Sequence, residues 1–363
     1  MTSSERIKTT INHKEPDKIP THINAAKWVV QKLKKALQVD SDKDLLKALH
    51  IDVYDMRGID IHSGVVPDYV GPENKFFPED WGGNIHAFWG MREFEHKTTS
   101  GWTLENEPPP LSDAVDIEDL KHYNWPSADW FDYSSLSSKL DAWSDFSIMA
   151  TGASVFQHPT FLRGMDMLMM DMAANPDMAN YILDKYTDFY YEYYRRIFQV
   201  AGEKIDVFAA ADDLGMQSSL LISPEMFDEY VAPRLKKLID LAHQHNIYFL
   251  LHSCGNIREL IPRFIDLGID ILDPVQPESM DPVAIKKEFG DKICLRGGIG
   301  AQNIMSNGTV QDVIDETKRI IDQLAPGGGY IIAPGHPVLQ DEVPVDNIIA
   351  MYETAYEYGR FID

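Results

Sequence analysis

Short apolar runs rich in β-branched residues alternate with helical patterns along the second half of the chain. Each run ends in a polar or glycine-bearing loop before the next amphipathic segment, such as 223–244, where Ser223 and Pro224 form a helix-start signal. The runs predict strands at 147–151, 207–211, 247–251, 269–272, 293–295 and 330–333. Alternating strands and helices indicate a parallel sheet with right-handed crossovers.

Two earlier runs, 19–23 and 51–56, bring the strand count to eight. Eight strand–helix units favour an α/β fold of the closed (β/α)8 TIM-barrel type. The number of strands alone does not exclude an open sheet, which is the alternative. Residues 64–140 fit the alternation poorly and are rich in Pro, Trp and Gly. We therefore expect a single barrel domain over 1–363, with 64–140 as a non-barrel excursion that covers one face.

Composition narrows the class of protein. Hydrophobic residues make up 44% of the chain, enough for a large core, and the formal net charge is −24. Such a charge opposes nucleic acid or an anionic membrane as partner. The chain has no apolar run of membrane-spanning length and no signal-like N-terminal segment, so we expect a cytoplasmic protein. In that compartment Cys254 and Cys294 are expected as a ligand or core filler, and a disulfide between them is the less favoured alternative.

Polar side chains gather where the predicted strands end. In TIM barrels the active site lies at the C-terminal ends of the strands. Those positions hold Asp212, Asp213, His252, Cys254, Asp273, Gln276, Arg296, Gly297, Gly298, Gly335 and His336. We therefore expect the chemistry of the protein at this rim.

The motif LLHSCGN, residues 250–256, is the most specific of these signals. Alternate residues of an extended segment point the same way, so His252 and Cys254 present an imidazole and a thiol together. These groups are preferred zinc ligands, and His336 follows the last predicted strand at the same mouth. We predict Zn²⁺ held by His252, Cys254 and His336 with one open position. The alternative is a buried histidine and a core cysteine that merely end a strand.

Other rim residues carry weaker signals. Asp212 and Asp213 are candidate catalytic residues that supply a fourth metal ligand, a supporting hydrogen bond or proton transfer, or else cap the helix that follows. Gln276 is a candidate for substrate binding or a loop-stabilising amide. His158, Arg296 and Gly297 are candidate cofactor-binding positions, although His158 also fits an ordinary loop and the glycines form no complete phosphate-binding fingerprint.

A family resemblance rests on several motifs together. They are NHKEPDKIP, DIEDLKHYNWPSADWFDY, ADDLGMQ, LLHSCGNI, GIDILDPVQ, GGIGAQ and LAPGGGYIIAPGH, spread between about residues 5 and 360. In these motifs the chain resembles the uroporphyrinogen decarboxylase superfamily, and within it the corrinoid-dependent methyltransferase branch. The resemblance implies a (β/α)8 barrel, a small-molecule methyl donor and a corrinoid (cobalamin) cofactor. Because the chain has no D-x-H-x-x-G motif, the corrinoid is expected on a separate partner protein.

Departures from the family pattern bear on the reaction. True decarboxylases carry arginines in the segment matching PTHINAAKWVV, residues 20–30, and this chain has none there, so decarboxylation is disfavoured. Relatives that methylate thiols have a cysteine at the place of His336. A zinc ion with one thiolate fewer is more electrophilic, which favours methyl transfer from a methoxylated, for example aromatic, donor to Co(I). The alternatives are transfer from a methyl-corrinoid to a thiol or tetrahydrofolate, and a non-catalytic corrinoid- or zinc-binding scaffold.

Overall fold

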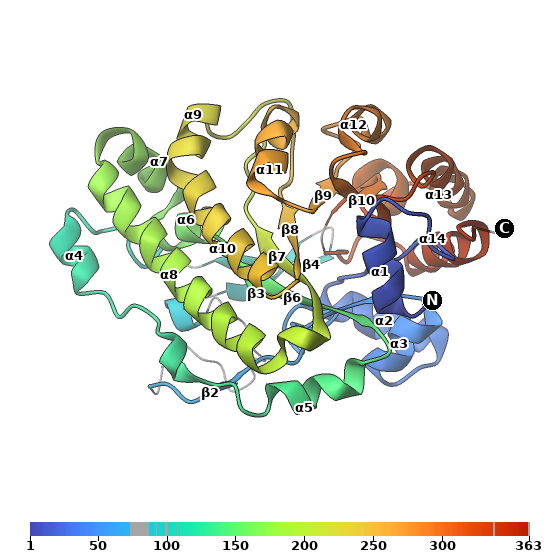
Figure 1. Ribbon diagram of the computed structural model, residues 1–363, viewed down its shortest axis with the longest axis horizontal. Coiled ribbons are helices and arrows are strands. Elements are labelled where there is room, and N and C mark those ends of the chain that lie inside the picture. Colours follow the sequence, from blue (N-terminus) through green and yellow to red (C-terminus); the bar gives the residue numbers. More distant parts are fainter. Residues whose placement is uncertain (73–86, 92, 99–100, 107, 337, 362–363) are drawn as a thin grey trace.

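Seven parallel strands form the central sheet of the computed structural model, which describes residues 1–72, 87–91, 93–98, 101–106, 108–336 and 338–361 (Figure 1). In spatial order the strands are β1 (Val53–Asp55), β6 (Ser147–Ala153), β7 (Ile205–Ala211), β8 (Tyr248–His252), β9 (Ile271–Val275), β10 (Cys294–Ile299) and β11 (Tyr330–Pro334). The six strands predicted in the second half of the chain correspond to β6–β11, with ends shifted by up to four residues.

The eighth position of the barrel is held by an extended segment rather than a full strand. The Ile332 amide donates to the Pro20 carbonyl at 3.0 Å, and the Asp52 amide donates to the Thr21 carbonyl at 3.1 Å. Thr21 therefore bridges β11 on one side and the start of β1 on the other. Pro20 has no N–H to donate, which helps to explain why the ladder stays short here. The predicted closed (β/α)8 architecture is confirmed.

Helices surround the sheet and make the crossovers (Figure 1). Their bounds are α1 (Ser3–Ile11), α2 (Lys27–Leu37), α3 (Asp42–Ala48), α4 (Ile117–Lys121), α5 (Leu136–Leu140), α6 (Gln157–Arg163), α7 (Met165–Ala174), α8 (Pro176–Ala201), α9 (Pro224–Met226), α10 (Ala232–Gln244), α11 (Ile261–Leu267), α12 (Pro282–Phe289), α13 (Val310–Leu324) and α14 (Val345–Tyr358). Ser223 caps α9 through its side chain, as the sequence predicts. Among the described residues, no helix has the length and apolar character needed to cross a membrane.

The barrel interior is layered. Its lower layer is apolar and contains Val53, Met149, Val207, Ala209, Leu250, Ile271, Cys294 and Ile331. Helix α1 closes this end, because Ile7 and Ile11 pack into the same cluster. Arg6 of α1 is also buried there and contacts Asp52 at 2.6 Å. The apolar layer separates this ion pair from the polar side chains at the opposite end of the barrel.

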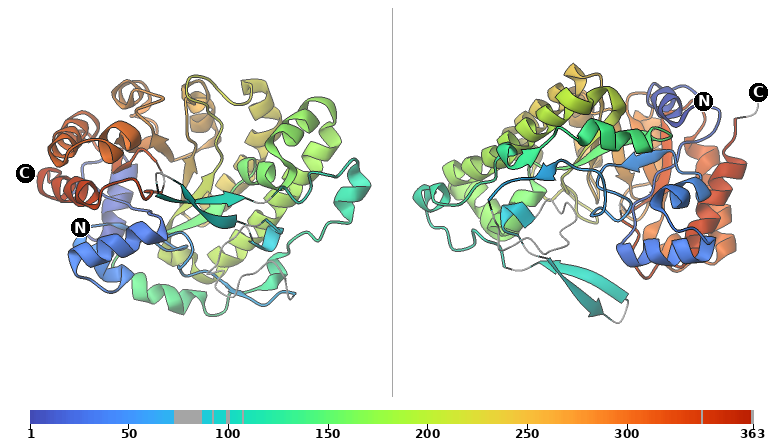
Figure 2. Two further views of the ribbon diagram at one scale, coloured as in Figure 1. Left: turned by 180° about the vertical axis from the view of Figure 1, so that it is seen from behind. Right: turned by 90° about the horizontal axis from the view of Figure 1, so that it is seen from below.

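Residues 64–140 contribute no strand to the barrel sheet in the part that is described. They form two antiparallel pairs instead, β2 (Asp68–Tyr69) with β5 (Phe131–Asp132) and β3 (Glu93–Thr98) with β4 (Gly101–Asn106). Figure 2 shows the β3–β4 hairpin on the face of the molecule opposite to α1, the side toward which the barrel strands run. Buried Arg163 of α6 holds the end of this region by donating to the carbonyls of Leu111 and Ala114 at 2.6 and 2.9 Å.

Candidate metal centre

Three potential metal ligands meet where β7 and β8 end. The ligand atoms of Asp213, His252 and Cys254 all lie within 4.8 Å of one another. His252 Nε2 is 3.4 Å from Cys254 Sγ and 3.5 Å from an Asp213 carboxylate oxygen. His252 is the last residue of β8, and the chain leaves the strand so that Cys254 turns to the same side. The structure thus brings together two of the three predicted zinc ligands and adds Asp213.

Gly255 is required for this turn. Its φ is +86°, and a Cβ there would come within 2.4 Å of the backbone carbonyl carbon of Gly215, in the loop after β7. The two loops therefore pass close enough for the Cys254 amide to donate to Asp213 at 2.9 Å. The close approach of these loops fixes Asp213 beside His252 and Cys254.

Asp273 orients the histidine. Its carboxylate lies 2.6 Å from His252 Nδ1, which leaves Nε2 directed at Cys254 and Asp213. Arg296 of β10 lies 3.3 Å from the other Asp273 oxygen. A carboxylate behind a histidine is the usual support of a metal-ligating imidazole, because it fixes the tautomer and the ring orientation.

The electrostatics of this group suit a cation. Burial by itself would lower the pKa of His252, but Cys254, Asp213 and Asp273 together raise it well above its usual value. Burial would likewise raise the pKa of Asp213, but the hydrogen bond and charge of His252 lower it to about 2. Anionic groups thus outnumber cations around His252 Nε2. A divalent ion would satisfy the same charges that now favour a proton.

The two neighbouring aspartates have different environments. Asp212 is fully buried and accepts hydrogen bonds from the Ser154 hydroxyl and from the amides of Val155, Phe156 and Gln157. Burial raises its pKa to about 6. These amides belong to the start of α6, so Asp212 caps this earlier helix and not the helix that follows it in the chain. Asp213, by contrast, faces the candidate ligands.

His336 lies at the rim but outside the donor group. Its side chain is exposed, and Nδ1 is 2.9 Å from the Val338 carbonyl oxygen. It is nevertheless close to Asp273. Burial raises the pKa of the Asp273 carboxyl group, but the charge of Arg296, with smaller contributions that include His336, lowers it below its usual value. His336 in this orientation is therefore a neighbour of the site and not a member of the donor cluster.

The remaining predicted site residues support the rim in different ways. Gln276 accepts a hydrogen bond from the Gly255 amide at 3.3 Å and so helps to hold the turn after Cys254. His158 is buried on α6, not in a loop, with Nδ1 3.4 Å from the Tyr190 hydroxyl. Gly297 lies within β10 at φ +108°, where a Cβ would approach the Val275 nitrogen to 3.1 Å. Close packing of β10 against β9 accounts for glycine at that position.

The layering adds Asp55, Arg57 and Thr151, which were not predicted from the sequence, to the predicted rim residues. Two residues beyond the apolar floor, the interior positions become Asp55, Thr151, His252, Asp273 and Arg296. Arg57, just past β1, donates to Thr151 Oγ1 at 2.6 Å. The signal was present in the sequence, because 51–56 is a predicted strand and Asp55 and Arg57 lie at its end.

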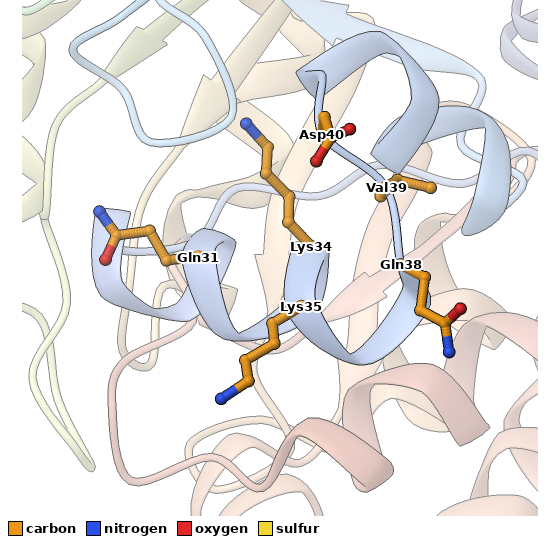
Figure 3. A pocket seen from close by; sticks show the side chains of 6 residues that line it. All are labelled: Gln31, Lys34, Lys35, Gln38, Val39 and Asp40. Atoms are coloured by element: carbon orange, nitrogen blue, oxygen red, sulfur yellow. The ribbon is translucent and has the colours of Figure 1, made fainter.

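A surface cavity of about 310 Å³ lies elsewhere, over α2 (Figure 3). Gln31, Lys34, Lys35, Gln38, Val39 and Asp40 line it. Lys34 pairs with Asp42 at 2.6 Å, and no residue of the candidate metal centre reaches the cavity. We assign the chemistry to the barrel mouth because the potential ligands gather there.

Comparison with known proteins agrees with this geometry. The family model for uroporphyrinogen decarboxylase (URO-D) matches residues 111–358, well over half of the chain. The chain belongs to the URO-D family. The family match confirms the resemblance predicted from the sequence motifs. The similar proteins include methyltransferases as well as decarboxylases.

Two curated relatives illustrate this range. The methylcobamide:CoM methyltransferase MtbA of Methanosarcina acetivorans is 28% identical over 170 residues, 44% of this chain and 46% of the relative. The uroporphyrinogen decarboxylase of Geobacter sulfurreducens is 24% identical over 192 residues, 52% of each protein. The chain thus spans about half the length of these relatives. A solved methyltransferase from Methanosarcina mazei covers 99% of both chains with a TM-score of 0.67 at 16% identity, which supports the fold.

Proposed function

We propose that this URO-D family member is a zinc-dependent methyltransferase, which moves a methyl group from a methoxylated donor to Co(I) of a corrinoid on a separate protein. The observation that carries the proposal is the grouping of His252, Cys254 and Asp213, with Asp273 behind His252. Thiolate, imidazole and carboxylate are all zinc ligands, and three protein ligands with one open position are typical of catalytic sites.

The third ligand has two candidates. The sequence pattern favours His336, and the geometry favours Asp213. In either case Asp273 and Arg296 would hold the His252 ring, since Asp273 lies within 3.3 Å of both side chains. Bound zinc would supply Lewis-acid chemistry at the open position.

The transfer step balances without a further reactant. The methyl–oxygen bond of the donor would break with its electron pair left on the donor oxygen, and the methyl group would be accepted by Co(I) of the partner's corrinoid, which supplies the electron pair of the new bond. Stabilising the negative charge that develops on that oxygen lowers the barrier. The protein must therefore hold the donor oxygen at the barrel mouth and leave its methyl group accessible to the corrinoid protein.

A second candidate is the transfer of a methyl group from a methyl-corrinoid to a thiol. The similar relative MtbA is named a methylcobamide:CoM methyltransferase, which favours this direction. A tetrahydrofolate acceptor and a non-catalytic scaffold remain weaker alternatives. Decarboxylation is disfavoured because residues 20–30 contain no arginine, and Lys27 is the one lysine among them.

An absorbance assay separates these functions. The zinc-loaded protein, mixed with a reduced corrinoid protein and methoxylated aromatic donors, should convert Co(I) to methyl-Co(III). Cys254→Ala should abolish the conversion, whereas Cys294→Ala should retain it, because Cys294 lies in the apolar floor of the barrel. His336→Cys should slow it if the predicted electrophilic zinc is correct. Failure with every donor, together with demethylation of methylcobalamin by an added thiol, would establish the second candidate instead.

A further inference from the structure

Buried polar atoms without partners surround the inner end of the barrel mouth. Within the described residues, both ring nitrogens of His22 and Nε of Arg296 are buried and have no hydrogen-bond partner. His22 is 1% exposed and Arg296 is 6% exposed. A buried donor without a partner is costly, at about 1–3 kcal/mol, so such atoms call for a ligand or ordered water.

The strand order places these groups around one space. The segment that carries His22 lies between β11 and β1, while β10, which carries Arg296, is the other neighbour of β11. Two residues beyond His22, the Asn24 amide donates to Asp55 at 3.3 Å, so both side chains of this extended segment point to the interior. Arg57 belongs to the same region, because it lies near Asp55 and donates to Thr151.

The hydrogen-bonding character of the groups limits what they can bind. An arginine Nε only donates, and a neutral imidazole offers one donor and one acceptor. Burial, followed by the charges of Arg296 and Arg57, lowers the pKa of His22 well below its usual value, so its ring is neutral. Asp273 Oδ1 is also buried without a hydrogen bond, but its charge is paired with Arg296 at 3.3 Å. The groups left for a ligand are therefore the Arg296 Nε donor and the His22 ring.

Charge points to the same ligand class. Asp273 is shared between Arg296 and His252, and His252 is in addition 3.5 Å from Asp213. Among the described residues Arg296 therefore has no carboxylate to itself. Asp55 is 3.6 Å from Arg57 and also accepts from Thr151 and Asn24. Zinc at His252 would add further positive charge beside Asp273. An anionic acceptor in this space would complete both the hydrogen bonds and the charge balance.

We propose that the methyl donor is a carboxylic acid, and that its carboxylate is received by Arg296 and His22 at the inner end of the mouth. Arg57 adds a second positive charge. That the bound carboxylic acid is the methyl donor rests on the proposed function. That the site binds a carboxylate does not. The methoxy group would then lie across the mouth from the carboxylate, beside His252 and Cys254.

The test compares two probes that differ in charge and little in shape, 3-methoxybenzoate and 3-methoxybenzamide. Binding to the zinc-loaded protein is measured by calorimetry, and KM and kcat by methyl transfer to the corrinoid protein. The wild-type protein should bind the benzoate more tightly than the benzamide. Arg296→Gln should raise the Kd of the benzoate by roughly tenfold to a hundredfold, as for one lost charge-assisted hydrogen bond, and change that of the benzamide by less than about threefold.

Two further variants keep the outcome interpretable. Arg57→Gln alters a more exposed cation and should weaken benzoate binding in the same selective way, even if Arg296→Gln folds poorly. Arg234→Gln is the matched control, since Arg234 is also a buried arginine but pairs with Asp184 on the helical side of the barrel. It should leave the preference for benzoate unchanged. Zinc content is measured for each variant, because Arg296 also supports Asp273.

The outcomes separate this subsite from the proposed reaction. Selective binding of the benzoate that depends on Arg296, without methyl transfer, would support the subsite and contradict the reaction. Equal binding of both probes, no saturable binding of the benzoate, or equal losses for both probes in Arg296→Gln would overturn the subsite. In those cases the unpartnered atoms bind ordered water.

Discussion

Replacing Asp212 should cost stability and leave the metal centre nearly intact. In Asp212→Ala, three backbone amides at the start of α6 lose their shared acceptor, and the Ser154 hydroxyl loses one partner. Unsatisfied buried donors cost about 1–3 kcal/mol each, but water entering the vacated space would reduce the total to about 3–5 kcal/mol. Burial of the carboxylate, which raises its pKa to about 6, offsets part of its own contribution.

We therefore expect a net loss of about 3 kcal/mol for Asp212→Ala, which for a chain of 363 residues lowers Tm by roughly 4 °C. Asp212→Asn keeps one acceptor oxygen and should lose about 1 kcal/mol. Thermal melting and elemental analysis are measured on the same samples. Asp213→Asn provides the contrast and should lower zinc content with little change in Tm. An unchanged Tm in Asp212→Ala together with lost zinc would refute the assignment of Asp212 as a helix cap.

The remaining predictions concern metal, pH and the barrel floor. Protein purified without chelator should hold about one zinc per chain, as a single site implies, and Cys254→Ala should lose most of it. Comparing the zinc content of Asp213→Ala with that of His336→Ala then identifies the third ligand. Full zinc retention in both variants would exclude both residues. Because the folded pKa of Asp212 is raised from 3.8 to about 6, its stabilising contribution is complete below pH 4 and is lost as pH rises toward 6 and beyond. The free energy of unfolding of the wild type relative to Asp212→Asn should therefore decline over that window, and a flat difference would contradict the raised pKa. Arg6→Ala should destabilise the fold by about 3 kcal/mol or more, since it leaves the buried Asp52 with Lys18 as its remaining cation. Methyl transfer at 25 °C should stay near wild type. An unchanged midpoint of urea unfolding would show that α1 contributes little to stability.

The sequence predicts the barrel well because strand alternation is a local property. Apolar runs followed by polar residues identify both the strands and the rim on which His252 and Cys254 lie. The role of Asp212 is not local, since the amides it accepts from lie 55 to 57 residues earlier in the chain. No sequence pattern around ADDLGMQ shows whether Asp212 caps α6 or the next helix in the chain. The direction of the two side chains after β7 decides which aspartate caps α6 and which faces His252 and Cys254.

His336 and His22 show two further limits of the sequence. A strand end predicts that His336 lies at the mouth, but its ring orientation depends on the following turn, where Nδ1 meets the Val338 carbonyl. His22 belongs to a segment with a single bridge to β11, so strand patterns alone do not give its register. Its burial beside two arginines becomes visible only when β10, β11 and β1 are assembled. The predicted third zinc ligand, His336, therefore stays a prediction.

The closure of the barrel floor by α1 has a consequence for the order of assembly. Ser4 donates to Asp206, 202 residues away, and the Gly329 amide donates to the Thr10 carbonyl. During synthesis α1 leaves the ribosome long before its docking surface on β7 and β11 exists. Its apolar residues Ile7 and Ile11 must therefore wait exposed, or bind elsewhere, until almost the whole chain has emerged. Folding of this barrel is accordingly expected to finish with the capture of one of its earliest segments.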